Sequence, residues 1–329
     1  MRLNEVYQPI RSDLDSVEEV LEASLHSSAA RNVSKINHYL LASPGKRIRP
    51  ALVILSAKAV LGSRAQTVRN RLIKLAAAME LIHMASLVHD DLIDNSLIRH
   101  HMPTINSRWG QDVSITLGDY LYATAFELIS KSGNMDILKC IAAATKAMCE
   151  GELHQVCERD NLKLLKEQYI TIVTKKTASL FAASCRAGTL AARSRRSMQK
   201  AMEEYGLNFG VAFQIADDYL DIVGMEASTG KMPGQDMRSG EMTLPLLFLI
   251  ELIPENEREE IQRLLSHNGN RESLKKIKSK LLASGAVSKT KEEILKYVKK
   301  AKKRVNQCVE SPYKESLLGL ADLIVEKGF

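Results

Sequence analysis

Two stretches with the same aspartate spacing, Leu87-Val-His-Asp-Asp-Leu-Ile-Asp94 and Ile215-Ala-Asp-Asp-Tyr-Leu-Asp221, are the most informative part of this chain. Their first aspartates lie 127 residues apart, and both stretches continue apolar segments of helical composition. On a helix, positions four apart lie on one face, so each stretch directs two carboxylates the same way. Such like charges repel in a half-buried place unless a cation compensates them. Mg²⁺ takes oxygen ligands from carboxylates and substrate phosphates, so the paired stretches predict a clamp on a diphosphate.

The bulk composition predicts a soluble globular protein. Of the 329 residues, 45% are apolar and 26% are charged, as in ordinary globular domains. No apolar run of the roughly 18 residues needed to span a bilayer is apparent, so no transmembrane helix is expected. The first residues lack the basic-then-apolar pattern of a signal peptide, which favours a cytoplasmic location. The five cysteines show no Cys-x-x-Cys spacing, so we expect reduced thiols rather than structural zinc or disulfides.

The sequence pattern is helical almost throughout. Alanine, leucine and methionine are frequent, and alternating β-branched runs of strand length are scarce. Several segments are apolar on nearly every face, which is typical of helices at the centre of a bundle: Pro50–Val60, Arg71–Val88, Val113–Ser130 and Glu204–Val223. The two aspartate stretches fall in different halves, and both halves must pack together if the stretches serve one site. A single all-α domain over residues 1–329 is therefore expected.

The C-terminal part of the chain is basic. Residues from Glu255 onward hold 17 lysines and arginines against 11 acidic residues, so they contribute six of the seven net positive charges. The densest run is Lys296–Arg304. One interpretation is an anionic partner such as membrane headgroups. The alternative, which we favour, is a solvated helix face, because Ile294, Val298, Ala301 and Val305 repeat at helical spacing. Nucleic acid is not expected.

Four separate cationic segments accompany the aspartates. The loop Pro44-Gly-Lys-Arg-Ile-Arg-Pro50 carries three cations before a helix, and Arg99 follows the first cluster. Lys175-Lys-Thr-Ala-Ser179 begins an apolar run, and Lys231 lies in the glycine-rich segment after the second cluster. Arginine is planar, permanently charged and bidentate, which suits phosphate oxygens. Each segment alone has an ordinary surface explanation, but their combination with two carboxylate clusters favours a diphosphate site.

The motifs resemble the trans-polyprenyl diphosphate synthase family over roughly residues 40 to 250. The matching elements, in family order, are Gly45-Lys-Arg-x-Arg-Pro50, Glu80-x-x-His83, the first aspartate cluster with Arg99 and Pro103-Thr104, Gly118-Asp119, Glu150-Gly-Glu152 with Gln155, Lys176-Thr-Ala178 and Phe213-Gln-x-x-Asp-Asp-x-x-Asp221. The resemblance implies an all-α isoprenoid-synthase bundle around a central cavity, usually a homodimer. It also implies head-to-tail condensation of isopentenyl diphosphate with an allylic diphosphate, with Mg²⁺ as cofactor and Mn²⁺ as a substitute.

The resemblance also assigns roles to individual residues. Catalysis is assigned to Asp90, Asp91, Asp94, Asp217, Asp218 and Lys176, and metal binding to Asp90, Asp94, Asp217, Asp218 and Asp221. The allylic diphosphate is assigned to Arg99, Lys176, Thr177, Gln214 and Lys231. Isopentenyl diphosphate is assigned to Lys46, Arg49, His83 and His100. Cation neutralisation makes diphosphate a leaving group, and a dry cavity protects the resulting allylic carbocation.

Two positions depart from the family pattern. His100 stands where a second arginine is usual, and Glu241 stands where a lysine is frequent. A histidine binds phosphate as a cation only when it is protonated, so weaker binding of isopentenyl diphosphate with a pH dependence is expected.

Product length is inferred from the residues upstream of the first cluster. A bulky aromatic four or five residues before this motif stops elongation early in the family, whereas this chain has Ser86 and Ala85. The growing tail should pass them and meet a floor deeper down, at Ile82, Ala78 or Phe126. The expected product is therefore longer than C20, in the range C30 to C40.

Other functions were weighed against this one. A geranylgeranyl or farnesyl diphosphate synthase would share the same motifs. A class I terpene cyclase normally carries a different second motif and needs no second cationic subsite. A subunit of a heteromeric prenyl synthase with weak activity alone tends to lose aspartates, whereas all six remain here.

Overall fold

The computed structural model describes residues 2–26, 31–42, 45–99, 101–223, 234–266 and 271–327. The chain forms two compact units, each described here by itself. Unit 1 comprises Met1–Thr145, Leu180–Gly206 and Arg304–Leu320, and unit 2 comprises Lys146–Ser179, Leu207–Lys303 and Ala321–Phe329. The organisation of residues 1–329 as one domain stays a prediction.

The all-α prediction is confirmed. The helices are α1 (Leu3–Tyr7), η1 (Gln8–Ile10), α2 (Arg11–Leu25), α3 (Arg31–Leu41), α4 (Ile48–Leu61), η2 (Gly62–Val68), α5 (Arg69–Ile93), α6 (Ile105–Trp109), α7 (Gln111–Ser130), α8 (Met135–Cys157), α9 (Lys166–Val173), η3 (Thr174–Ala178), α10 (Ser179–Ala191), α11 (Arg196–Val223), α13 (Gln235–Arg238), α14 (Leu244–Leu252), α15 (Glu255–Ser266), α16 (Arg271–Ser284), α17 (Ala286–Val305) and α18 (Pro312–Lys327). The strands of the described residues are β1 (Ile98–Arg99) and β2 (Met102–Pro103), paired antiparallel with Ile98 opposite Pro103.

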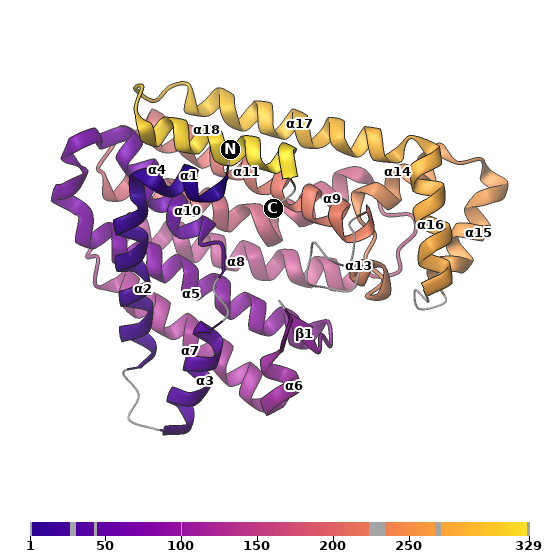
Figure 1. Ribbon diagram of the computed structural model, residues 1–329, viewed down its shortest axis with the longest axis horizontal. Helices are drawn as coiled ribbons and strands as arrows, with labels where there is room; N and C mark the ends of the chain where they lie inside the picture. Colours follow the sequence, from indigo (N-terminus) through magenta and orange to yellow (C-terminus); the bar gives the residue numbers. More distant parts are fainter. Residues whose placement is uncertain are drawn as a thin grey trace. The chain divides into compact units, whose positions relative to one another are not determined.

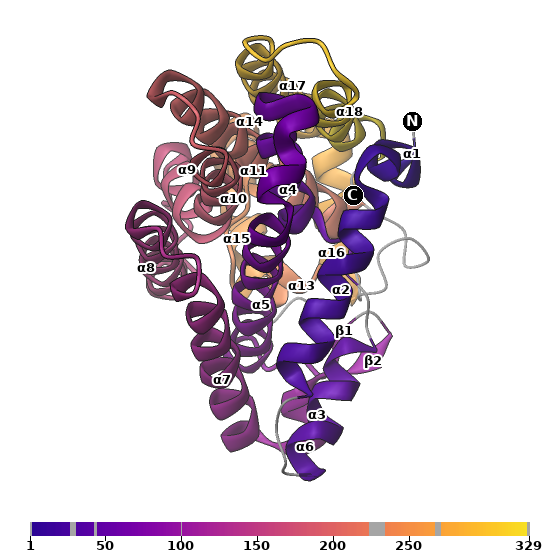
Figure 2. The ribbon, with the colours of Figure 1, turned by 90° about the vertical axis from the view of Figure 1, so that its left-hand side faces the viewer.

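Helix α5 is the centre of unit 1. It packs along α4, α2 and α7, and the views in Figures 1 and 2 show α7 running beside it. Its residues Ala76, Ala77, Ala78 and Met79 are consecutive and fully buried, so the helix is covered on every side. This is what a segment that is apolar all round predicts.

The described part of the chain contains one segment that could span a membrane by its length and composition, contrary to the expectation that there is none. Gln66–Ile93 is long and apolar enough to cross a bilayer, but 72% of its apolar window is buried inside the protein. A helix buried by other helices needs the same apolar surface as one buried by lipid, so this pattern fits a core helix.

Glycine allows α7 to approach α5 closely next to the first aspartate cluster. A Cβ added to Gly118 of α7 would lie 2.1 Å from Nε2 of His89. The ring of His89 therefore occupies the space that any other residue at position 118 would fill, and it contacts the carbonyl oxygen of Ile115 at 3.2 Å. The Gly118-Asp119 motif thus has a packing reason.

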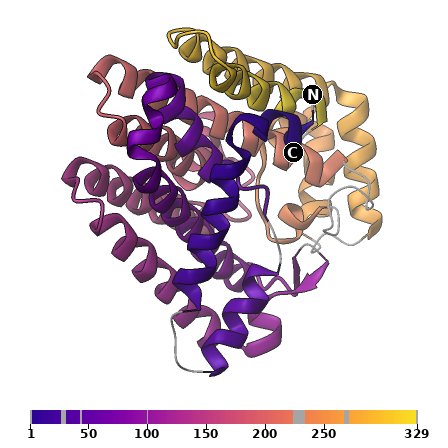
Figure 3. The same ribbon diagram turned by 60° about the vertical axis from the view of Figure 1, so that its left-hand side comes forward.

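A buried ion-pair network fixes the start of α4. Arg47 adopts a left-handed backbone conformation (φ 52°) directly before the helix. Its guanidinium donates to Glu80 of α5 at 2.9 Å and, through two nitrogens, to Glu18 of α2 at 2.5 and 3.0 Å. Helix α2 also packs against α3, as Figures 2 and 3 show. Three helices are therefore tied together at the loop that carries the first cationic motif.

Unit 2 holds the second aspartate cluster near the end of α11. Within this unit α14 and α15 both pack against α16, which Figure 1 shows. Helix α17 buries Ile294, Val298 and Ala301, so the apolar spacing predicted for the basic segment is confirmed. Ion pairs tie α17 to α9 (Lys166 to Glu293, 2.6 Å) and to α14 (Lys289 to Glu251, 3.0 Å).

We predict that Glu80→Ala lowers the free energy of unfolding by about 3–5 kcal/mol, because it leaves a buried guanidinium partly unpaired. The measurement is urea unfolding of the purified protein. Glu18→Ala is the matched control: Glu18 shares the partner Arg47 but its side chain is 42% exposed, against 4% for Glu80. The control should cost about 1 kcal/mol or less. Equal losses would contradict the central role of Glu80.

Candidate functional site

The first aspartate cluster forms the last turn of α5. Asp94 ends the helix, and its N–H donates to the carbonyl oxygen of Asp90 at 2.9 Å. Asp90 and Asp94 are half-buried, whereas Asp91 is buried. The predicted i, i+4 pair of Asp90 and Asp94 is therefore confirmed as one helical turn, with the intervening carboxylate directed inward.

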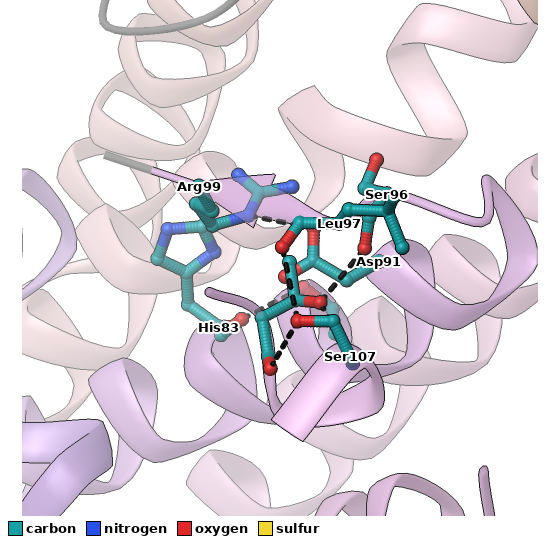
Figure 4. A network of polar contacts seen from close by, with 8 residues as sticks. His83, Asp91, Ser96, Leu97, Arg99 and Ser107 are labelled. Carbon is teal, nitrogen blue, oxygen red and sulfur yellow. Dashed lines mark hydrogen bonds and ion pairs between the residues drawn. The ribbon is translucent and has the colours of Figure 1, made fainter. Parts of the chain in front are cut away.

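Arg99 compensates the buried carboxylate. It lies on β1, and its Nε donates to Oδ1 of Asp91 at 2.8 Å (Figure 4). The segment carrying it is held by Ser107, whose hydroxyl donates to the carbonyl oxygen of Leu97 at 3.0 Å. Figure 4 also shows the ring of His83 beside the Arg99 side chain. Arg99 is thus positioned next to the aspartates, with one of its nitrogens already engaged.

A group of positive charges lies around His83 in unit 1. Burial, followed by the charges of Arg49, Arg99 and Arg47, holds the pKa of His83 well below its ordinary value. Arg49 stacks over the ring of Phe181 at 4.3 Å, and its Nε is buried without a hydrogen-bond partner among the described residues. Burial also lowers the pKa of Arg49 to about 10. A buried donor without an acceptor is costly, so this group is suited to receive an anion.

Of the three cations in the Gly45–Pro50 loop, the structure separates one from the others. Arg47, the cation of this loop to which no ligand was assigned, donates its guanidinium to Glu18 and Glu80. Lys46 is exposed, and its carbonyl oxygen accepts from Tyr7 at 2.8 Å, which fixes the backbone at this position. Lys46 and Arg49 stay the predicted ligands of an anion.

The second cluster divides its three aspartates between different environments. Asp217 is exposed and makes no hydrogen bond or ion pair with another described residue. Asp218 is buried and accepts from the Tyr169 hydroxyl (2.5 Å) and from Nε2 of Gln214 (2.7 Å). The Thr177 hydroxyl in turn donates to Oε1 of Gln214 at 2.8 Å. Of the two predicted ligands, Gln214 therefore donates directly to Asp218, and Thr177 is linked to it through Gln214.

Asp221 is held by backbone groups. Its two carboxylate oxygens accept from the N–H groups of Gln235 and Asp236 at 3.2 and 3.1 Å, at the first turn of α13. Its carbonyl oxygen accepts from the N–H of Gly234 at 2.9 Å. Asp221 thus joins the end of α11 to α13, and among the three aspartates Asp217 has the most accessible oxygens.

Negative charge accumulates around this cluster. The pKa of Asp218 is raised to about 7: burial is the largest cause, the hydrogen bonds from Tyr169 and Gln214 oppose it, and the charges of Asp217 and Glu241 add to it. Burial and the neighbouring carboxylates, Asp221 first, raise the pKa of Asp236 well above its ordinary value. A hard divalent cation would displace the protons from such carboxylates and neutralise their negative charge.

A π-helical turn presents Lys176. This turn, η3, connects α9 and α10 and carries both Lys176 and Thr177; π-turns often occur at functional positions. Lys176 pairs with Glu152 of α8 at 2.6 Å. A Cβ added to Gly151 would lie 2.3 Å from the Lys176 backbone nitrogen, so glycine permits this close approach. The Glu150-Gly-Glu152 motif therefore positions Lys176 as well as neutralising it.

The predicted chain-length residues lie along α5. Ile82 and Ala85 are buried and Ser86 is half-buried, with its hydroxyl donating to the carbonyl oxygen of His83 at 2.9 Å. Phe126, on the neighbouring α7, is half-buried. Two predicted ligands, His100 and Lys231, lie outside the described residues.

The donors fit a metal that completes its coordination from elsewhere. Within the part of the chain that the structure describes, no group of three or more His, Cys, Asp or Glu side chains is arranged to hold a metal. Mg²⁺ usually takes one or two protein carboxylates and fills the remaining positions with water and phosphate oxygens. Asp90 with Asp94, and Asp217, match that requirement better than they match an all-protein cage.

Four residues that contact the residues of the predicted motifs were not predicted from the sequence. Glu80 and Glu152 appeared only as motif letters, yet each neutralises a cation of the predicted sites. Tyr169 gave no signal in sequence, because its partner lies 49 residues away. Asp236 could have been found from its place in the segment after the second cluster.

Comparison with known proteins places the chain among prenyl synthases. A sequence profile of the family described as Polyprenyl synthetase matches residues 30–281. A Short chain isoprenyl diphosphate synthase from Methanothermobacter thermautotrophicus is 32% identical, with 98% of this chain and 99% of the relative covered. Heptaprenyl diphosphate synthase component 2 from Geobacillus stearothermophilus is 37% identical over 76% of each chain. A polyprenyl synthase from Caulobacter crescentus, solved with calcium and isoprenyl diphosphate, superimposes with a TM-score of 0.93 at 32% identity, covering 100% and 98%.

We predict that Asp218→Asn removes a pH-dependent part of the stability of the metal-free protein. The pKa of Asp218 is about 7 when folded, against an ordinary value of 3.8. The stability that protonated Asp218 contributes to the folded state is therefore fully present below about pH 4. It is lost as pH rises through 7, by about 1.4 kcal/mol in the free energy of unfolding per pH unit. Urea unfolding in EDTA at several pH values measures it. The stability difference between variant and wild type should change over this window, while Asp15→Asn, at an exposed position of α2 away from this cluster, should show a constant difference.

Proposed function

Because the chain belongs to the polyprenyl synthetase family, we propose that it condenses isopentenyl diphosphate with an allylic diphosphate, farnesyl or geranylgeranyl, to give a polyprenyl diphosphate longer than C20. The observation that carries the substrate assignment is the buried, unpartnered Nε of Arg49 among the charges around His83. A cation group of this kind suits a diphosphate. The relative solved with calcium and isoprenyl diphosphate supports both the ligand class and a divalent metal.

The residues of unit 1 are proposed to bind both charged partners of the reaction. Lys46, Arg49 and the neutral His83 hold the diphosphate of isopentenyl diphosphate, with Arg49 supplying a desolvated donor. Asp90 and Asp94 would hold Mg²⁺, which Mn²⁺ could replace. When bound, the metal neutralises the charge that develops on the leaving diphosphate. Arg99 supports the same group while its Nε donates to Asp91 at 2.8 Å.

The residues of unit 2 are proposed to act on the allylic diphosphate. Asp217 offers the accessible carboxylate for metal, with Asp218 and Asp221 in support. Lys176 must share its ammonium between Glu152 and the incoming phosphate, and Lys231 is predicted to join it. Thr177 and Gln214 set the orientation of Asp218 through their hydrogen bonds. Ionisation of the allylic substrate then lets the double bond of isopentenyl diphosphate attack, and the released diphosphate accepts the proton.

The product length and the assembly belong to the same proposal. Small residues at positions 85 and 86 favour elongation beyond C20, although the relatives include both a short-chain and a heptaprenyl synthase. We propose a cytoplasmic homodimer. The alternative assembly, a subunit of a heteromeric synthase, is favoured by the likeness to a protein named component 2.

We predict that Asp90→Asn and Asp217→Asn each lower kcat by roughly 100–1000-fold, the size of effect expected when charge stabilisation of a transition state is lost. The assay combines labelled isopentenyl diphosphate, farnesyl diphosphate and Mg²⁺. Asp112→Asn, at an exposed position on α7, is the control and should retain activity. An inactive wild-type protein that gains activity only with a second polypeptide would identify a heteromeric enzyme. Full activity in either cluster variant would refute the assignment of that cluster.

We predict that Ala85→Tyr shortens the product, because a phenol at a buried position of α5 obstructs the elongating tail. Chromatography of dephosphorylated products measures the chain length. Ala123→Tyr places the same side chain at an exposed position of α7 and should leave the products unchanged. Unaltered products from Ala85→Tyr in a folded, active enzyme would refute the proposed path of the tail.

A further inference from the structure

The outer face of α17 is a strongly basic surface that neither aspartate cluster uses. Its exposed residues include Lys296, Lys299, Lys300 and Lys303, with one exposed acid, Glu292. Within the described part of the chain, Lys299 and Lys303 form no ion pair. The uncompensated positive charge is thus concentrated in the second half of the helix.

Apolar and aromatic groups accompany these lysines. Leu295 is 39% exposed and precedes Lys299 and Lys303 by one and two turns, so the three residues form one row. The ammonium of Lys300 lies 4.8 Å from the centre of the Tyr297 ring, and Tyr297 is half-buried. Lysine stems, a leucine and a tyrosine are the side chains that occupy a membrane–water interface.

The helix is anchored with this face outward. Ile294, Val298 and Ala301 are buried on the opposite side, and Lys302 pairs with Asp322 of α18 at 2.8 Å. The helix therefore cannot turn its apolar face toward a ligand without losing its packing. A partner must be recognised by charge, with only a shallow apolar contact through Leu295.

We propose that the outer face of α17 docks this protein peripherally on an anionic lipid bilayer. The charge complements anionic headgroups, and the exposed leucine adds a contact that an acidic protein surface or a nucleic acid would not require. The purpose of such docking rests on the proposed function, because a polyprenyl diphosphate longer than C20 is a lipid that partitions into a bilayer. The binding itself depends only on the surface.

The test is co-sedimentation of the purified full-length protein with vesicles of phosphatidylcholine alone or mixed with phosphatidylglycerol, at low and high salt. We expect binding to the mixed vesicles only, weakened by salt. The triple variant Lys299→Gln, Lys300→Gln and Lys303→Gln should bind roughly 100-fold more weakly, at about fivefold per lysine. The matched control replaces three exposed lysines elsewhere by glutamine, Lys139, Lys275 and Lys276, and should bind as wild type does.

Four results would overturn the proposal. Equal weakening in the control variant would show that net charge alone attracts the protein. Equal binding to neutral vesicles would show that charge has no part, and the absence of binding to any vesicle would leave α17 a solvated face. Tighter binding to a DNA duplex than to the mixed vesicles would reassign the face to nucleic acid. Turnover of both variants with soluble substrates should match wild type, so a failed activity assay and failed vesicle binding are distinguishable.

Discussion

The repulsion between like charges held close together in a partly buried environment is the constraint on which both candidate sites depend. Unit 1 gathers positive charge around His83, and unit 2 gathers carboxylates around Asp218. Each unit neutralises only part of its own charge. Glu80 and Glu18 hold Arg47, and Asp91 holds Arg99, but Arg49 keeps a buried Nε without a partner. This incomplete compensation is the reason why each unit is proposed to bind a ligand.

The fold holds these charges by packing. The middle of helix α5 is buried on every side, so core packing fixes the helix whose last turn carries the carboxylates. Gly118 and Gly151 remove the Cβ atoms that would keep α7 from His89 and α8 from Lys176. The π-helical turn at Thr174–Ala178 places Thr177 within hydrogen-bond distance of Gln214. The two glycines and the π-helical turn therefore position His89, Lys176 and Thr177.

Much of the fold and of the two clusters was predictable from the sequence. The contacts that were not predictable share a physical reason. The segments that are apolar on nearly every face correspond to α4, α5, α7 and α11. They were predictable because a helix buried on all sides is apolar all round. The spacing of Asp90 and Asp94 predicted their shared turn. In contrast, the carboxylate partners of Arg47 and the Tyr169 partner of Asp218 lie 29 to 49 residues away, and spacing along the chain carries no information about such contacts. The sequence likewise does not show that Arg47, unlike Arg49, is held by two carboxylates.

The direction of the pKa shifts indicates what each unit requires. In unit 1 the pKa values of His83 and Arg49 are lowered, so adding an anion there would relieve the cost of holding positive charge. In unit 2 the pKa values of Asp218 and Asp236 are raised, so adding a cation would relieve the opposite cost. A ligand of one sign satisfies only one unit. A diphosphate carries the sign that unit 1 requires and a divalent cation the sign that unit 2 requires. Because these two ligands also bind each other, substrate and metal are expected to bind more tightly together than either does alone.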